Sequence, residues 1–220
     1  MRWAWPFWIY AGVSLIHLVS IAFPAAGDEL TKALLMPVLL VSVLVVAFRK
    51  ERMRGARAWW GVGLLGLGIV ASFFGDILLG PSFIVGLACF AAAHLVYIAL
   101  FNGPARARPI AWLSLGYVVV LVVLVIVLWP HLGDLRPVLI GYGVVLALTA
   151  MTSTRVGAIA AWGGGLFLAS DALLAFRLFY PDFRTAFPDP WQDLAIMALY
   201  CAGEGLIALG VIRRLRALPA

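Results

Sequence analysis

The sequence predicts an all-α integral membrane protein, a bundle of about eight transmembrane helices that forms one domain over residues 1–220. Composition is the first reason: 65% of the residues are hydrophobic and 12% are charged, whereas soluble domains carry about 25% charged residues. The second reason is distribution, since the apolar residues form long runs separated by short segments with charges, Gly and Pro. A soluble fold of this size could not bury so much apolar surface, so lipid must solvate much of it.

Eight apolar runs are long enough to cross a bilayer, which needs about 20 helical residues for a hydrocarbon core of about 30 Å. The second and sixth runs are the shortest. Gly80-Pro81-Ser82 leaves a tight turn between the third and fourth, which predicts a helical hairpin. The predicted spans are residues 4–23, 33–48, 59–79, 83–101, 110–129, 137–152, 156–179 and 194–212.

The N-terminal run has some features of a signal peptide, because Arg2 precedes it and the small residues 24–27 follow it. We expect an uncleaved first span instead. Seven further apolar runs keep the product in the membrane in either case.

The distribution of basic residues orients the spans. With alternating spans, twelve Lys and Arg residues fall on one side of the membrane and three on the other, and the second side collects most of the acids. Because cytoplasmic loops are enriched in Lys and Arg, we predict a multi-pass protein of the plasma (inner) membrane with both termini in the cytoplasm. The twelve are Arg2, Arg49, Lys50, Arg52, Arg54, Arg57, Arg106, Arg108, Arg155, Arg213, Arg214 and Arg216, and the three are Lys32, Arg136 and Arg184.

Several other functions are disfavoured by the residue patterns. The net charge of +6 lies in short loops and not on one face of a domain, so we expect no nucleic-acid partner. The sequence contains no GxSxG elbow and no phosphate-binding glycine loop. The two cysteines and three histidines lack zinc-ligand spacing. We therefore expect neither a metal site nor a cofactor.

Three acids lie inside the apolar spans, where an ionisable group costs about 2.5–3.5 kcal/mol on insertion scales. Such residues nearly always face a bundle interior or a wet cavity. Counted along the helices, all three lie in the outer half of the bundle or near its midplane, with Asp171 deeper than Asp76. The acids and the polar residues that share these spans are Asp76, Asp171, Glu204, His17, His94, Tyr97, Ser170 and Tyr200.

Two of these acids sit in similar segments four spans apart, Gly75-Asp76-Ile77-Leu78-Leu79 and Ser170-Asp171-Ala172-Leu173-Leu174. The similarity suggests two parallel four-helix repeats in which the two Asp residues face a common axis. The alternative is a chance match between Leu-rich helices.

Two facing carboxyl groups in a low-dielectric pocket suit acid–base chemistry. Burial makes a carboxyl group hold its proton more tightly, and a second carboxyl group nearby strengthens the effect. One group can then donate a proton while the other stays ionised. The structural alternative is that each Asp only pairs with a neighbouring helix.

Five segments resemble the YhhN-like lysoplasmalogenases over nearly the whole chain. The resemblance implies eight spans, no metal, and hydrolysis of the vinyl-ether bond of a lysophospholipid substrate to a fatty aldehyde and glycerophospho-ethanolamine or -choline. Glu204 departs from the family pattern, in which Ala-Gln is expected. The segments are KALLMP (32–37), SFFGDILL (72–79), GLACFAAAHLVY (86–97), FLASDALL (167–174) and YCAGEGLIALG (200–210).

The resemblance implies catalytic roles for Asp76 and Asp171 and supporting roles for Lys32, His94, Tyr97, Ser170 and Tyr200, to which the buried acid Glu204 is added. Vinyl-ether hydration needs a proton donor for the β-carbon and an anion beside the oxocarbenium-like cation, as in glycoside hydrolysis. Either Asp could be the donor, with the deeper Asp171 the better candidate. Lys32 could hold the lipid phosphate as a point charge.

Two other functions remain open from the sequence. Buried acids also serve as proton relays, so a proton-coupled transporter or a non-hydrolytic lipid-binding protein is the alternative, and a structural membrane partner is a third. The headgroup, the chain length and the oligomeric state stay open.

Overall fold

The computed structural model describes residues 2–23, 28–49 and 53–219. Within them, eight helices are long and apolar enough to cross a membrane, which confirms the predicted fold class. Residues 24–27 and the basic residues Lys50 and Arg52 lie outside the described part. The long helices are α1 (Trp5–Ala22), α2 (Asp28–Ala47), α3 (Gly55–Leu78), α4 (Phe83–Asn102), α5 (Gly116–Leu128), α6 (Arg136–Ser153), α7 (Ala158–Phe179) and α9 (Trp191–Arg216).

Short helical segments extend or join the spans. The 3₁₀ turns Trp112–Leu115 and Trp129–His131 lengthen α5 at both ends, and Gly133–Leu135 leads into α6. Another 3₁₀ turn, Arg2–Ala4, precedes α1, and the four-residue helix α8 (Phe183–Ala186) lies in the connection between α7 and α9.

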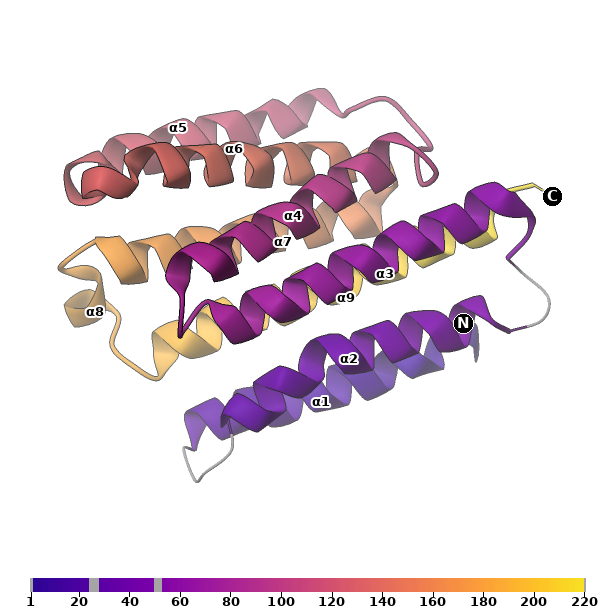
Figure 1. Ribbon diagram of the computed structural model, residues 1–220, viewed down its shortest axis with the longest axis horizontal. Coiled ribbons are helices and arrows are strands. Elements are labelled where there is room, and N and C mark those ends of the chain that lie inside the picture. Colours follow the sequence, from indigo (N-terminus) through magenta and orange to yellow (C-terminus); the bar gives the residue numbers. More distant parts are fainter. Residues whose placement is uncertain (1, 24–27, 50–52, 220) are drawn as a thin grey trace.

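The spans lie side by side, with the two ends of the chain at the same end of the bundle (Figure 1). The pairs α1–α2, α3–α4 and α7–α9 pack along one another, and α9 also contacts α1, α2 and α3. The central position of α9 explains why it is the most buried span, whereas α5 lies at the edge and is the least buried.

Most predicted span ends are correct to within a few residues. The fifth span was predicted from residue 110, but its α-helix begins at Gly116 after the 3₁₀ turn Trp112–Leu115. The exceptions at charged ends have one cause. The second span was predicted from residue 33 but begins at Asp28, and the eighth extends to Trp191 and Arg216 at its two ends. A span predicted from hydropathy ends where charged residues begin, but the helix continues through these residues. Acids in the first turn and Arg residues in the last turn are favoured by the helix dipole.

Glycines let the central helices approach closely. A Cβ added to Gly163 of α7 would lie 2.6 Å from the Ile207 backbone nitrogen of α9, and one added to Gly203 would lie 2.9 Å from the Phe167 backbone nitrogen. Small residues at membrane helix contacts allow such backbone approach. Gly163 and Gly203 therefore let α7 and α9 pack backbone against backbone.

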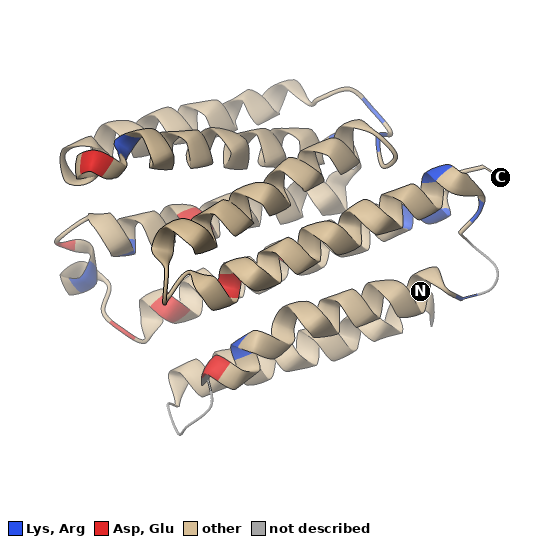
Figure 2. Cartoon of the chain, in the orientation of Figure 1, with Lys and Arg blue, Asp and Glu red and all other residues tan. Residues whose placement is uncertain are grey.

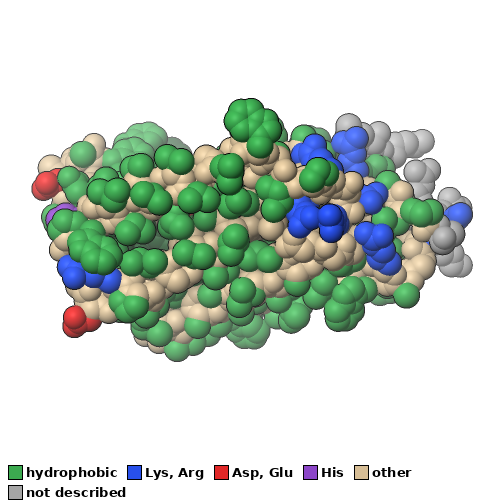
Figure 3. Space-filling model, turned by 90° about the horizontal axis from the view of Figure 1, so that it is seen from above, with side chains coloured by type: hydrophobic (Ala, Val, Ile, Leu, Met, Phe, Trp, Pro, Cys, Tyr) green, Lys and Arg blue, Asp and Glu red, His purple; other side chains and the backbone are tan. Residues whose placement is uncertain are grey.

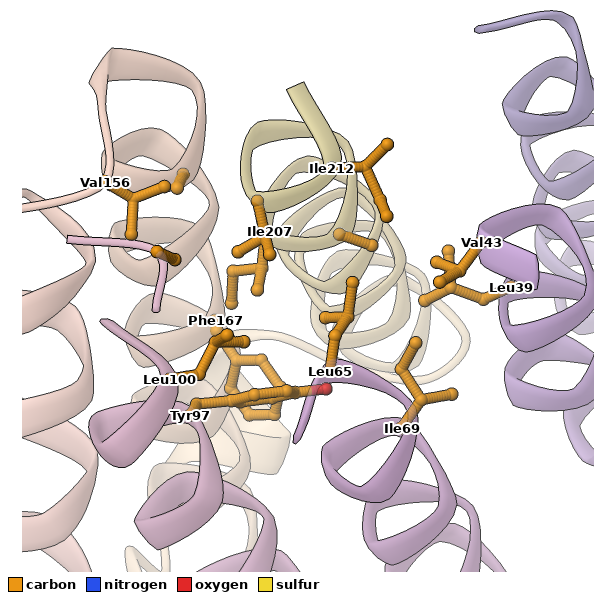
Figure 4. Packing of buried hydrophobic residues seen from close by; sticks show 14 of the residues in the cluster. Leu39, Val43, Leu65, Ile69, Tyr97, Leu100, Val156, Phe167, Ile207 and Ile212 are labelled. Carbon is orange, nitrogen blue, oxygen red and sulfur yellow. The ribbon is translucent and has the colours of Figure 1, made fainter. Parts of the chain in front are cut away.

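The buried apolar core lies between α9 and its neighbours. Figure 4 shows Leu65 and Ile69 of α3, Phe167 of α7 and Ile207 of α9 meeting between the helices. Lipid surrounds the outside of the bundle, so the helices gain little from removing apolar surface from water. The close packing of this core instead determines which helices are neighbours.

Charged residues are segregated along the bundle axis. Lys and Arg gather at the end where both termini lie, and acids concentrate toward the opposite end (Figure 2). The face in Figure 3 is apolar along much of its length, with its basic residues mainly at one end. This distribution suits a membrane-spanning bundle whose termini lie on the positive side.

The helix neighbours are consistent with two four-helix repeats. Helix α2 packs on α3 as α6 packs on α7, and α4 contacts α6 as α9 contacts α2. The first and second halves also differ within the described residues: α1 packs on α9, but α5 makes no comparable contact with α4.

Candidate active site

A cavity of about 560 Å³ lies in the half of the bundle away from the termini. Its walls are mostly apolar, with leucines of α5, α6 and α7 among them. Asp76, two residues before the end of α3, and Asp171, in the middle of α7, both line it. The two acids that the sequence predicted to be catalytic therefore face one space.

Each of these carboxyl groups is held by a tyrosine from another helix. The Tyr200 hydroxyl of α9 donates to Asp76 Oδ2 at 2.7 Å, and the Tyr142 hydroxyl of α6 donates to Asp171 Oδ2. In the described part of the chain, the second oxygen of each Asp makes no hydrogen bond. Neither of these two oxygens is among the buried polar atoms that lack a partner, so both are accessible. Each Asp thus has one tethered oxygen and one that is open to the cavity.

Charged side chains surround the polar end of the cavity. Lys32, Glu29, Arg177, Asp189 and Asp193 all line it. Arg177 and Asp193 form an ion pair, whereas Lys32 makes no ion pair or hydrogen bond among the described residues. Lys32 lies in the second turn of α2 and lines the same cavity as Asp76, so a half-buried cation and a carboxyl group face one space.

Ser170 also lines the cavity, but its hydroxyl is already used. It donates to the Ile196 carbonyl oxygen of α9 at 2.9 Å. This bond joins α7 to α9 next to Asp171, which indicates a supporting position.

Glu204, Tyr97 and His94 are fully buried and do not line the cavity. Glu204 lies near the middle of α9 and accepts hydrogen bonds from Ser72 of α3 and Tyr97 of α4, both at 2.8 Å. The structure therefore separates the predicted residues into a cavity-lining set and a second set behind the wall.

Sequence reasoning missed Tyr142. Its hydroxyl lies between Asp171 and the Nε2 atom of His94, which is 3.5 Å away. The available signal was a tyrosine in an apolar span, the same signal that singled out Tyr97 and Tyr200. Arg177 and Asp193 were also left out of the predicted site because each lies near a span end, where charges are common.

No group of three or more His, Cys, Asp or Glu side chains in the described ranges could hold a metal ion. The expectation that the reaction needs no metal or cofactor stays a prediction. The groups that line the cavity include carboxyl groups, tyrosine hydroxyls, a lysine, His17 and Arg177, and such groups suit proton transfer and cation stabilisation.

The chain is similar to one protein family over most of its length. A family model described as the YhhN family matches residues 27–211. The chain is 30% identical over 212 residues to lysoplasmalogenase TMEM86B of Sus scrofa, which covers 96% of this chain and 86% of that protein. It is 28% identical over 214 residues to lysoplasmalogenase TMEM86B of Mus musculus, and this alignment covers 96% of this chain and 87% of that protein. No solved structure matches the chain.

Proposed function

The chain belongs to the YhhN family, and we propose that it is a lysoplasmalogenase-like hydrolase that cleaves the vinyl-ether bond of lysoplasmalogens. The products would be a fatty aldehyde and glycerophospho-ethanolamine or -choline. One observation carries the proposal beyond the family relationship: two tyrosine-tethered carboxyl groups face one mostly apolar cavity with charged residues at its polar end. A single-chain lipid with a charged headgroup is complementary to such a cavity.

The proposed chemistry starts with a proton from Asp171 to the β-carbon of the vinyl ether, which leaves an oxocarbenium-like cation. Ionised Asp76 stabilises that cation electrostatically. A water oxygen then bonds to the carbon next to the ether oxygen, and the water's proton returns to a carboxylate. The resulting hemiacetal breaks its bond to the glycerol oxygen, which takes the hydroxyl proton, so no net proton is consumed.

Asp171 is the better donor because it lies deeper. It is in the middle of α7, whereas Asp76 is near the end of α3 and beside Lys32. A carboxylate next to a cation at the polar end is suited to stabilise a positive charge and to orient water.

Lys32 is the proposed phosphate contact. Its ammonium group lies at the polar end of the cavity and has no ion-pair partner among the described residues. A lysophospholipid whose phosphate met Lys32 would direct its alkenyl chain toward the leucines of α5, α6 and α7. His94, Tyr97 and Glu204 would support the wall from behind.

The first experiment measures aldehyde release from lysoplasmenylethanolamine by purified protein in detergent. Wild-type protein should release aldehyde, and Asp76→Asn and Asp171→Asn should not release it at a comparable rate. Asp134→Asn, an exposed acid at the same end of the bundle, is the matched control and should be fully active. A folded wild-type protein that releases no aldehyde would contradict the proposal.

A solvent isotope experiment tests the chemistry itself. In deuterated water, protonation of the β-carbon must place one deuterium on the carbon next to the aldehyde carbonyl. Trapping the aldehyde by reduction and measuring its mass gives the answer. An aldehyde without that deuterium would show that the bond is cleaved by another route.

A proton-coupled carrier makes the opposite prediction in the same assay. It would move an intact lipid and respond to a proton gradient, whereas the proposed enzyme works in detergent without a gradient.

We also propose that the protein lies in the plasma (inner) membrane with both termini in the cytoplasm. A C-terminal fluorescent protein should fluoresce, and a C-terminal periplasmic phosphatase fusion should be inactive.

A further inference from the structure

A chain of three side chains connects the cavity to the interior between α4, α6 and α7. The Tyr142 hydroxyl donates to Asp171 Oδ2 and lies 3.5 Å from His94 Nε2. Tyr142 and Asp171 line the cavity, and His94 lies behind them with no exposed surface. The chain therefore runs from a fully buried imidazole to a carboxyl group that faces the cavity.

The direction of this chain follows from counting protons. A tyrosine hydroxyl has one proton, and Tyr142 uses it in the hydrogen bond that it donates to Asp171. In its contact with His94, the Tyr142 oxygen can therefore only accept a hydrogen bond. This direction requires a His94 tautomer with its proton on Nε2. The other ring nitrogen, Nδ1, is buried and has no hydrogen-bond partner in the described part, which agrees with a neutral ring whose Nδ1 is unprotonated.

Aromatic rings hold His94 in this orientation. Its ring makes edge-to-face contacts with Phe167 at 4.7 Å and with Tyr142 at 5.8 Å between centroids. An unpaired buried nitrogen costs about 1–3 kcal/mol, and a purely structural wall could be built from apolar residues without that cost. The polar atom that justifies a histidine here is Nε2, which points at Tyr142.

We propose that Tyr142 is a positioning residue for Asp171, and that His94 sets the direction in which the Tyr142 hydroxyl points. Tyr142 occupies Oδ2, so Oδ1 is the oxygen that exchanges a proton with the bound lipid. Without this tether, the carboxyl group could rotate and present either oxygen. This inference rests on the proposed function, because it assigns the orientation of the proposed proton donor.

Tyr142→Phe removes the hydroxyl and keeps the ring. Its kcat should fall up to about tenfold, the size expected for loss of one hydrogen bond to an uncharged group, and its KM should change little. Tyr117→Phe is the matched control, because this tyrosine lies on the neighbouring α5 and does not line the cavity. An unchanged kcat in Tyr142→Phe would overturn the inference.

His94→Phe tests the second link and separates positioning from general packing. It should lower kcat less than Tyr142→Phe does, and adding it to Tyr142→Phe should cause little further loss, because both changes break one chain. Full additivity of the two effects would contradict the inference. If Tyr142→Phe does not fold, His94→Phe alone must still lower kcat at constant KM.

Infrared spectroscopy provides a readout that does not need activity. The carboxyl or carboxylate band that disappears in Asp171→Asn should shift in Tyr142→Phe and, by a smaller amount, in His94→Phe. An unshifted band would overturn the inference even in an inactive protein. Absence of aldehyde from wild type together with a shifted band would instead contradict the proposed function and leave the hydrogen-bond chain in place.

Discussion

The two halves of the bundle share a frame but differ in their polar residues. Asp76 and Asp171 lie in the similar segments Gly75–Leu79 at the end of α3 and Ser170–Leu174 of α7, and the next helix of each half carries Phe90 in one case and Tyr200 in the other. These two rings touch edge to face at 6.2 Å. Tyr200 reaches across to hold Asp76, but Phe90 has no hydroxyl to offer Asp171, whose partner comes from α6 instead.

The same contrast recurs one helical turn further along. His94 of the first half contacts the ring of Phe167 in the second, and at the corresponding sequence positions Glu204 of the second half accepts a hydrogen bond from Ser72 in the first. The contact of His94 is between two rings, whereas the contact of Glu204 is a hydrogen bond. Similar helix packing in the two halves therefore surrounds two carboxyl groups that have different partners, and the proposed function gives these groups different tasks.

The largest effects should come from the two carboxyl groups, and they should be unequal. Asp171→Asn removes the proposed proton donor and should lower kcat on the order of 10²–10⁴-fold. Asp76→Asn removes only electrostatic stabilisation and should cost about 10²–10³-fold. Aldehyde release at saturating lipid measures both. A larger loss in Asp76→Asn would exchange the proposed roles.

The next effect concerns Lys32, which lines the same cavity as Asp76 of the first half. Lys32→Gln should raise KM about 10- to 100-fold through the lost charge-assisted phosphate contact, and Lys32→Arg should recover part of it. Titration of initial rates with lysoplasmenylethanolamine gives KM. Arg184→Gln, an exposed cation of α8, should leave KM unchanged, and an equal rise there would indicate a general surface-charge effect.

Tyr200→Phe makes the second half resemble the first at this pair of positions. Asp76 loses its tether, and kcat should fall about tenfold, as expected for one hydrogen bond to a charged group. The control is Tyr180→Phe, at the end of α7 and outside the cavity lining. Rates equal to wild type would show that the Asp76 tether is structural only.

The smallest expected effect is on stability. Gly163→Ala places a methyl group against the backbone of α9, and overpacking of this kind costs about 1–3 kcal/mol. Gly12→Ala on α1 meets nothing within 4 Å and serves as the matched control. Thermal unfolding in detergent should show a lower Tm for Gly163→Ala alone. Equal Tm values would mean that the α7–α9 contact can spread apart.

Local sequence patterns predicted most of the fold. The eight spans and the hairpin at Gly80-Pro81-Ser82 depend on composition within a few helical turns, and both agree with the structure. The span ends at Asp28, Trp191 and Arg216 were missed, because hydropathy excludes charged helix termini that the helix dipole favours.

The sequence by itself determined the fold class, the approximate spans and the identity of the acids inside them, because a bilayer of fixed thickness imposes a length and makes every buried charge conspicuous. Only the tertiary structure decided that Asp76 and Asp171 share a cavity, that Tyr142 holds Asp171, and that Glu204 lies behind the wall. Those outcomes depend on how each helix is rotated and which helix is its neighbour. Contacts between residues far apart in the chain, such as the glycine contacts of α7 and α9, set both.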